Sequence, residues 1–531
     1  MTVQQIRITG TGSELQGVGR ADDGRAVFVP GALPGECVEV EIIRQAPRFC
    51  EGRVVRVLEA SGARREPDCP CYGRCGGCHA RHMQYAETLK LKRQRVYDAL
   101  TRIGGLTEPV VRETLGCAQP DRTRNKAEFP IVHGKIGAYA AGSHALVSLE
   151  DCLLQREPAV HALRWFAKKL PSLSCASHLT ALVTRVNRAG EMMLTVCADA
   201  PVASEIEKLL PELRRDLPEL VSVYFLRQNR RPSHALDGAC THLWGAKALE
   251  ETLHHLKFEL SPQSFFQVNP DQAERLYDCA LEAAGLTESS DARILDAYCG
   301  VGTITLAAAQ RAAHVIGVEI VPPAIADARE NARRNGLSNR ARFILGDAAA
   351  EIPKLIAHGE HFDAAILDPP RKGADEKLLD ALIRAGIPTL SYVSCDPATL
   401  ARDVKRLIAG GYLLQWAQPV DMFPWTGHIE TVCLLSKLQS KEHIEIEVKM
   451  DELDLTSAES KATYEEIKAY VLEHSGLKVS SLYIAQVKQK CGIIERENYN
   501  KPKSENAKQP QCPPEKEEAI TEALKHFGMI L

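Results

Sequence analysis

From residue 263 onward, short apolar runs alternate with helical stretches, and this pattern constrains the fold more than any other feature of the chain. Five runs are rich in Val, Ile, Leu and Ala, and helical stretches separate the early ones: RILDAY, HVIGVEI, RFILGD, FDAAILD and TLSYVSC. Such runs are typical of parallel strands that are covered on both faces. We therefore predict a doubly wound α/β sheet over residues 263–438, with ligands bound at the carboxyl edge of its strands.

The segment LDAYCGVGTI, residues 295–304, reads as a strand, a turn containing Gly300 and Gly302, and the start of a helix. Glycines let the backbone approach a ligand, and a helix N-terminus favours a polar or negative group. Glu319 ends the next strand, where it could accept hydrogen bonds from ribose hydroxyls, and Asp347 ends the third, near an adenine edge. The third glycine of GxGxxG is missing, so the pattern favours S-adenosylmethionine (SAM) over a dinucleotide. Ordinary polar residues at strand ends are the alternative.

The segment FDAAILDPPRKG, residues 362–373, places Asp368 and two prolines at the end of the fourth strand. In amino-methyltransferases, a similar position carries Asn or Asp, then Pro-Pro, then an aromatic residue that stacks on the base. Arg371 stands in the place of that aromatic residue. The difference argues against methylation of an exocyclic amine and points to chemistry at a ring carbon.

Cys395 follows the fifth apolar run, in YVSCDPATLARD, and it could be a core thiol, a metal ligand or a nucleophile. Uracil C5 is too poor a nucleophile to attack a methylsulfonium unaided. A thiolate that adds to C6 makes C5 nucleophilic, and a base must then remove the C5 proton so that the thiolate can leave. Cys395 is placed for such an attack, and a nearby cation such as Arg371 could lower its pKa.

The base could be Glu430, at the start of the last predicted strand in FPWTGHIETVCLLSK. A carboxyl buried beside Trp425 and Phe423 would have a raised pKa and could act as a base. His428 is the rival candidate.

Residues 1–60 contain short strand-like pieces separated by turns rich in glycine or proline, which predicts a small antiparallel β-barrel. The segment resembles the TRAM domain, an oligonucleotide-binding type of barrel on RNA-modifying enzymes. Residues 61–262 contain CPCYGRCGGC at 69–78, then a basic helical stretch, and then a mixture of strands and helices, which predicts an α+β central domain. Residues 441–531 begin with an acidic stretch, contain helical candidates and a polar loop, and predict a small, mainly helical appendage of unknown role.

Taken together, these pieces resemble the RNA 5-methyluridine methyltransferases of the RumA/TrmA-like family, over residues 1 to about 438. Five motifs occur in family order: SPQSFFQVNP, LDAYCGVGTI, ILDPPRKG, YVSCDPATLARD and GHIETV. The resemblance implies SAM-dependent methylation of uridine at C5 in RNA, with Cys395 as nucleophile and Glu430 as base. It further implies that four residues contact SAM: Gln267, Tyr298, Glu319 and Asp368.

The same resemblance interprets CPCYGRCGGC as part of a [4Fe-4S] site. Its implied ligands are Cys69, Cys75, Cys78 and the distant Cys152, whereas Cys71 is an additional thiol without a ligand role. Spacing alone would also allow zinc. A TRAM barrel together with a cluster resembles the enzymes that act on 23S ribosomal RNA, so the resemblance favours that substrate over tRNA.

Two other functions share part of this pattern. RNA cytosine-5 methyltransferases use the same thiolate addition, but they usually carry a second cysteine in the Asp-Pro-Pro region, and DPPRKG has none. A non-catalytic rRNA-binding assembly factor would not need both Cys395 and Glu430.

The formal net charge of −4 does not by itself indicate a nucleic-acid-binding protein, so that inference depends on the motifs. No run of about 18 apolar residues could span a membrane, and the N-terminal residues lack the features of a signal peptide. We expect a cytoplasmic monomer whose 17 cysteines are reduced thiols or ligands rather than disulfides.

Overall fold

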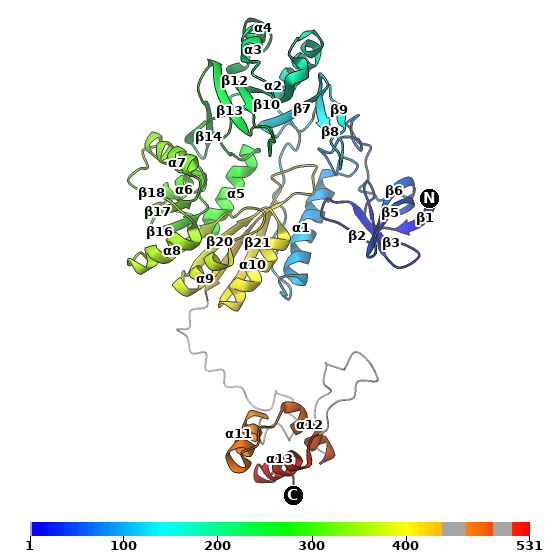
Figure 1. Cartoon of the computed structure of the whole chain (residues 1–531), viewed down its shortest axis with the longest axis vertical. Helices are drawn as coiled ribbons and strands as arrows, with labels where there is room; N and C mark the ends of the chain where they lie inside the picture. The colour runs from blue at the N-terminus through cyan, green and yellow to red at the C-terminus, as the bar shows by residue number, and fades with distance from the viewer. Residues whose placement is uncertain (1–2, 438–463, 492–511, 531) are drawn as a thin grey trace. The chain divides into compact units, whose positions relative to one another are not determined.

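A computed structural model of the chain describes residues 3–437, 464–491 and 512–530 (Figure 1). Contacts divide the chain into two compact units, Met1–Leu438 and Gln439–Leu531, and each is described by itself. The acidic stretch at 442–454 and most of the polar loop at 498–515 lie outside the described residues. None of the helices in the described ranges is long and apolar enough to cross a membrane.

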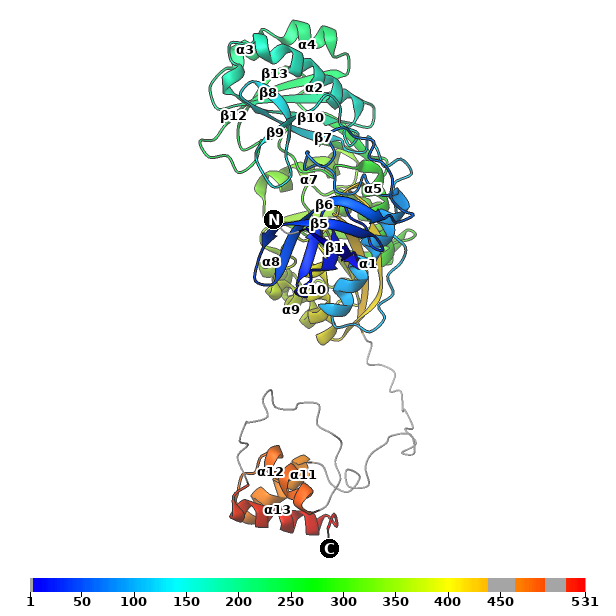
Figure 2. The ribbon, with the colours of Figure 1, turned by 90° about the vertical axis from the view of Figure 1, so that its right-hand side faces the viewer.

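The chain begins with a strongly curved six-stranded sheet in the order β1-β5-β6-β4-β3-β2 (Figure 2). Alternate side chains along its strands are buried, as in β4, because successive residues of a strand point to opposite faces. The pairing is antiparallel except between β4 and β6. Its strands are β1 Val3–Arg7, β2 Gly10–Thr11, β3 Gly17–Arg20, β4 Ala26–Val29, β5 Cys37–Gln45 and β6 Phe49–Glu59.

Helix α1, Tyr85–Arg102, joins the central domain in sequence but packs against the last part of the first unit. Its buried residues recur at the three- and four-residue spacing of one helix face, and they include Lys92 as well as Val96 and Leu100. The helix lies beside α10, Pro397–Ala409, and β21, Tyr412–Val420 (Figure 1). A charged residue on the buried face of α1 therefore needs a partner in the interior.

The central domain contains a seven-stranded sheet in the order β13-β12-β11-β10-β7-β8-β9 and a separate hairpin of β14 and β15. Its strands are β7 Lys126–Val132, β8 Lys135–Tyr139, β9 Leu146–Ser148, β10 Leu179–Val186, β11 Met192–Ala198, β12 Leu220–Gln228, β13 Gly238–Gly245, β14 Leu249–Leu253 and β15 Leu256–Leu260. Its helices are α2 Glu157–Lys169, α3 Ala203–Glu207 and α4 Leu210–Asp216, with 3₁₀ turns at Leu170–Ser172 and Ala176–His178.

The last part of the first unit is a seven-stranded sheet in the order β18-β17-β16-β19-β20-β22-β21. The five predicted strands are parallel, and helices alternate with them as expected. Strand β22, predicted as the last strand, lies between β20 and β21 and runs antiparallel to both, and the loop at 421–429 joins it to β21. The strand order reverses between β16 and β19, and ligands of open α/β sheets bind at such a point.

The strands of this sheet are β16 Ser290–Ala297, β17 Ala312–Glu319, β18 Ala341–Leu345, β19 Ala364–Leu367, β20 Thr389–Ser394, β21 and β22 Glu430–Lys437. Its helices are α5 Pro270–Ala283, α6 Thr303–Ala309, α7 Pro322–Arg334, α8 Ala348–Ala357, α9 Glu376–Ala385 and α10.

The second unit contains three described helices, α11 Tyr464–Ser475, α12 Ser481–Lys490 and α13 Pro514–His526. They share a small apolar core that includes Ile467, Ile484 and Ile520. This core is separate from those of the first unit, so the second unit has its own source of stability.

Candidate active site

A cavity of about 1170 Å³ opens at the carboxyl edge of the last sheet. The six residues predicted to bind SAM or carry out the reaction all line it: Gln267, Tyr298, Glu319, Asp368, Cys395 and Glu430. Another cavity, of about 640 Å³, lies near the amino ends of β17 and β18 and contains none of them. The structure thus brings together side chains that are up to 163 positions apart in the sequence, at the edge where ligands of this fold class bind.

One half of the cavity is built around the glycine turn after β16. The backbone N–H groups of Gly300 and Val321 donate to the two carboxylate oxygens of Glu319, at 3.1 and 2.9 Å. Tyr298 has a left-handed φ of 68°, a strained conformation for a residue with a side chain. A Cβ on Gly302 would stand 3.1 Å from the Phe343 ring, so the turn passes too close for a larger residue. Glu319 holds this turn in place and keeps lone pairs for a ligand.

Asp296 is a cavity residue that the sequence analysis missed. It lies near the end of β16, and its Oδ2 accepts a hydrogen bond from the Thr305 hydroxyl at 2.5 Å. Its other oxygen is buried without a hydrogen-bond partner among the described residues. Burial, followed by the nearby Asp368 and Glu319, raises the pKa of this carboxyl to about 7. The sequence feature that could have indicated Asp296 is the presence of an acidic residue within the apolar run RILDAY.

Asp347 lines the cavity too, but one of its oxygens caps helix α8 by accepting from the Ala349 N–H at 3.0 Å. On the facing wall, Asn125 donates from its side chain to the Gln267 carbonyl at 3.1 Å. Phe265 stands at the mouth of the cavity with 75% of its surface exposed. Exposed aromatic rings can stack on unpaired bases, so this face suits a nucleic acid better than a small polar substrate.

Cys395 lies between the end of β20 and the Asp396 side chain that caps α10. Asp396 accepts hydrogen bonds from the Ala398 and Thr399 N–H groups, and Pro397 begins the helix without needing a partner for its nitrogen. This junction leaves the thiol at the cavity wall rather than in the sheet core.

Glu430 begins β22, the strand that pairs with β20. Ser394 pairs with Thr431, so the next position along this register sets Cys395 opposite Glu430. Residues directly opposite each other in an antiparallel pair point to the same face. The thiol and the carboxyl therefore face the same cavity.

The sequence predicted that a nearby cation would lower the pKa of Cys395, but the combined effect of its surroundings is to raise it. Burial raises the pKa of the thiol to about 11, and Glu430 and Asp368 add to this effect. Arg371, exposed at the rim, acts in the predicted direction and lowers the pKa, but it does not outweigh burial. Cys395 is therefore protonated at neutral pH in the free protein.

The two candidate bases differ in their environment. Glu430 is only 6% exposed, and burial together with Asp368 raises its pKa well above the usual range. Burial, together with the nearby Arg371 and His79, lowers the pKa of His428 to about 4. Both side chains line the cavity, as does Phe423.

Trp425 was expected beside Glu430, but it does not line the cavity. Its ring packs on the Arg81 guanidinium and on Tyr85, and its indole N–H donates to Asp121 at 2.9 Å. The Trp425 carbonyl accepts from the N–H groups of His79 and Ala80 at 2.8 and 3.1 Å, immediately after the cysteine-rich loop. Trp425 therefore anchors the loop that precedes Glu430 instead of shielding the carboxyl.

The four predicted cluster ligands lie in one neighbourhood. Cys69 and Cys152 each contribute to raising the pKa of Cys75, after burial, and Cys152 does the same for Cys78. Cys71 contributes to the same effect on Cys75, and it is buried beside the Ser148 carbonyl. Within the described residues, however, no group of three or more His, Cys, Asp or Glu side chains could hold a metal ion.

Comparisons with known proteins decide the family. A TRAM domain model matches residues 2–55, and a tRNA (Uracil-5-)-methyltransferase model matches residues 245–438. An uncharacterized RNA methyltransferase of Halalkalibacterium halodurans is 39% identical over 426 residues, covering 78% of this chain and 92% of the relative. The chain belongs to the RNA (uracil-5-)-methyltransferase family. A relative from Clostridium tetani, with the same description, is 39% identical over 82% of this chain and 97% of its own length.

Membership of this family confirms three expectations from the sequence: the chain is a SAM-dependent RNA methyltransferase, its N-terminal barrel is a TRAM domain, and its last sheet has the SAM methyltransferase fold. The fold is also that of the Pyrococcus abyssi tRNA (uracil-54, C5)-methyltransferase, which was solved in complex with S-adenosyl-L-homocysteine. That structure has a TM-score of 0.64 and 24% identity, and the match covers 81% of this chain and all of the other.

Proposed function

We propose that this methyltransferase transfers a methyl group from SAM to C5 of uridine in RNA, with Cys395 as nucleophile and Glu430 as base. The observation that carries the proposal is the pairing of β20 with β22, which sets this thiol and this carboxyl opposite each other in one cavity. When bound, SAM would supply the methyl group from its sulfonium. Gln267, Tyr298, Glu319 and Asp368 would hold it in the other half of the cavity.

The proposed reaction has three steps, of which Cys395 carries out the first and Glu430 the last. The Cys395 thiolate forms a bond to C6 of the uracil ring, and the electron pair of the C5–C6 double bond moves to C5 and its neighbouring carbonyl. C5 then takes the methyl group, whose bond to the sulfonium sulfur would break and leave that sulfur as a neutral thioether. Glu430 accepts the remaining C5 proton, the double bond forms again, and the sulfur leaves C6 as a thiolate.

The raised pKa values support these roles. A carboxyl whose pKa is raised by burial is a stronger base once ionised than an ordinary glutamate. The thiol must lose its proton before attack, and a cationic sulfonium nearby would favour the thiolate. Arg371 at the rim acts in the same direction.

The uridine must leave its stack to reach a thiol at the cavity wall, so a loop or other unpaired segment is the proposed target. We propose 23S ribosomal RNA as the substrate, on the resemblance of the TRAM barrel and cysteine loop to enzymes of that RNA. Mass spectrometry of 23S RNA from a deletion strain should show the loss of 5-methyluridine. Unchanged content would refute the ribosomal assignment.

Transfer RNA is the second candidate. The solved protein with the same fold is named a tRNA (uracil-54, C5)-methyltransferase, and the match extends well beyond residues 245–438. This likeness in fold keeps tRNA as the alternative to the ribosomal substrate. Analysis of bulk tRNA from the same deletion strain distinguishes them, because only one of the two pools should lose the modification.

We further propose that Cys69, Cys75, Cys78 and Cys152 hold a [4Fe-4S] cluster. Four thiolates around one zinc ion stand about 3.8 Å apart, given a Zn–S distance of about 2.3 Å. Support for a cluster comes from the resemblance, from the four thiolates that such clusters require, and from the proximity of Cys69 and Cys152 to Cys75. A colourless, iron-free protein after anaerobic purification would remove this proposal.

A further inference from the structure

The loop at 421–429, between β21 and β22, carries two cavity residues, Phe423 and His428, and leads directly into Glu430. Its length of nine residues exceeds that of a tight hairpin turn. Its backbone is therefore not fixed by the sheet ladder alone. The ladder pairs Val420 with Glu430 at the root of the loop, so groups outside the loop set the course of the nine residues between them.

The start of the loop is tied to α1 by a buried ion pair. The Lys92 ammonium donates to the Asp421 carboxylate, and both side chains are 0% exposed. Tyr85, also from α1, donates its hydroxyl to the other Asp421 oxygen at 2.7 Å. Lys92 donates in addition to the Phe423 carbonyl at 3.1 Å. We call Lys92, Tyr85 and Asp421 the loop anchor.

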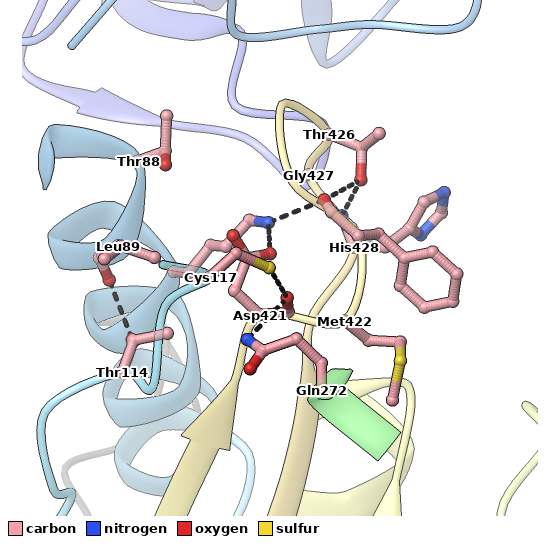
Figure 3. A network of polar contacts seen from close by, with 12 residues as sticks. Thr88, Leu89, Thr114, Cys117, Gln272, Asp421, Met422, Thr426, Gly427 and His428 are labelled. Atoms are coloured by element: carbon pink, nitrogen blue, oxygen red, sulfur yellow. Dashed lines mark hydrogen bonds and ion pairs between the residues drawn. The ribbon is translucent and has the colours of Figure 1, made fainter. Parts of the chain in front are cut away.

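Two further segments of the chain contact the backbone of Asp421 (Figure 3). The Asp421 carbonyl accepts from the Gln272 side chain of α5 at 3.0 Å and from the Cys117 thiol at 3.6 Å. Figure 3 shows these groups converging on Asp421, with Thr426, Gly427 and His428 following at the far end of the loop. Segments more than 300 positions apart therefore meet at this residue.

The far end of the loop is tied to the same face of α1. Arg95, one turn after Lys92, donates to the Gly427 carbonyl at 2.6 Å and to the Ser13 carbonyl of the TRAM barrel at 2.9 Å. Residues three apart on a helix are neighbours on its surface. Helix α1 thus presents one cation to each end of the loop that delivers Glu430.

A buried ion pair by itself adds little to the stability of a fold, because the free energy needed to remove two charges from water offsets most of their attraction. Burial lowers the pKa of Lys92, and Asp421 opposes that effect. Such pairs do have directional hydrogen bonds that apolar packing lacks, and these specify one geometry. The anchor fits that use, since both groups to which Lys92 donates, the Asp421 carboxylate and the Phe423 carbonyl, belong to the loop.

We propose that Lys92 and Asp421 are positioning residues, which hold the loop so that the Glu430 carboxyl faces the C5 proton of the bound uridine. This inference rests on the proposed function of Glu430. Its consequence is specific: loosening the anchor slows proton removal, and the covalent intermediate between Cys395 and RNA accumulates. SAM binding, which uses the other half of the cavity, is largely unaffected.

The experiment uses the full chain with Lys92→Met and Asp421→Asn, and Glu430→Gln as reference. Each variant is incubated with SAM and with 23S RNA and tRNA transcripts, and the covalent adduct is measured on denaturing gels. We expect the two anchor variants to accumulate adduct, to lose about 100-fold in kcat, as a displacement of about 1 Å can cause, and to keep their Kd for SAM within about twofold.

Leu163→Ala is the matched control, because Leu163 is fully buried in α2 of the central domain and its truncation lowers stability without touching the loop. It should lower Tm and accumulate no adduct. Should Lys92→Met fail to fold, Tyr85→Phe removes a single hydrogen bond from Asp421 and must show a smaller effect of the same kind.

Anchor variants that lower Tm like Leu163→Ala, with normal kcat and no adduct, would overturn the positioning role. The outcomes also separate the two proposals. If Glu430→Gln itself accumulates no adduct, the assignment of the base fails first, and the anchor loses its proposed purpose. If Glu430→Gln accumulates adduct and the anchor variants do not, only the inference about Lys92 and Asp421 fails.

Discussion

Cys395 directly follows the end of β20 and Glu430 begins the antiparallel strand β22, so the two residues flank the Ser394–Thr431 pair and line one cavity. The two groups interact electrostatically, since Glu430 raises the pKa of the Cys395 thiol. Arg371 and Asp368 act on the pKa of both groups. A thiol and a carboxyl held on one cavity wall by strand register require no loop movement to reach the same substrate ring.

The first prediction concerns the titration of Cys395. Because its pKa is raised to about 11, the thiolate fraction is small at pH 7 and grows about tenfold for each unit of pH below the pKa. Alkylation of the free enzyme by iodoacetamide, followed on the peptide that contains Cys395, should therefore keep accelerating from pH 7 to pH 10. A rate that levels off below pH 8 would contradict the protonated resting thiol.

The charges around this thiol predict opposite effects of two substitutions. Removing the negative charge in Glu430→Gln should lower the pKa of Cys395 and speed alkylation several-fold at pH 8. Removing the cation in Arg371→Gln should raise the pKa and slow alkylation, because Arg371 opposes the effect of burial. Changes in the same direction for both variants would show that something other than charge controls the thiol.

Glu319 should matter for SAM affinity. Glu319→Gln weakens the bonds to the Gly300 and Val321 N–H groups and to the ribose, and we expect a loss of about 1.5–3 kcal/mol, roughly 10- to 100-fold in Kd. Isothermal titration calorimetry measures this change. Asp363→Asn is the matched control, because that carboxylate also accepts from a backbone N–H, of Arg293 at 2.8 Å, but at the opposite edge of the sheet. Equal losses in the two variants would indicate general damage to the fold.

Gly427 should tolerate no side chain. A Cβ there would stand 2.5 Å from the Ser13 carbonyl oxygen of the barrel, a backbone atom that cannot easily move. We expect Gly427→Ala to destabilise the protein by about 1–3 kcal/mol, measured by chemical denaturation. Gly10→Ala, in a strand with nothing within 4 Å of the added atom, should be close to neutral. A neutral Gly427→Ala would mean that barrel and loop do not pack as described.

The second unit should be dispensable for folding of the first. Among the residues that the structure describes, the apolar core shared by α11, α12 and α13 is formed by residues of the second unit. A chain that ends at Leu438 should keep its Tm and its affinity for SAM, and residues 439–531 alone should show helical circular dichroism. Aggregation of the shortened chain would show that the units depend on each other.

Much of the site could be predicted because its residues stand at strand ends. The apolar runs located β16 to β20, and the polar residues that follow them, such as Glu319 and Asp368, necessarily meet at one edge of a parallel sheet. Cys395 was located in the same way. Helix α1 was also predicted, from its spacing of apolar residues.

Other features depend on contacts between distant segments, which no local pattern encodes. Lys92 reads as one more lysine in a basic helix, and its burial depends on Asp421, 329 positions later. The reversed direction of β22 could not be read from its apolar residues, since hydrophobicity does not distinguish parallel from antiparallel neighbours. Trp425 was misplaced for a related reason: its partners Arg81 and Asp121 lie in another part of the chain.

The most direct test of the proposed chemistry is the capture of its intermediate. Glu430→Gln protein, incubated with SAM and with unmodified 23S RNA or tRNA transcripts, is digested and analysed by mass spectrometry. We predict a peptide in which Cys395 is bonded to C6 of a 5-methylated uridine, with one RNA class only, and no such peptide in the Cys395→Ala, Glu430→Gln double variant. Absence of the adduct with both RNAs, or an adduct on a different cysteine, would contradict the assignment of Cys395 and Glu430.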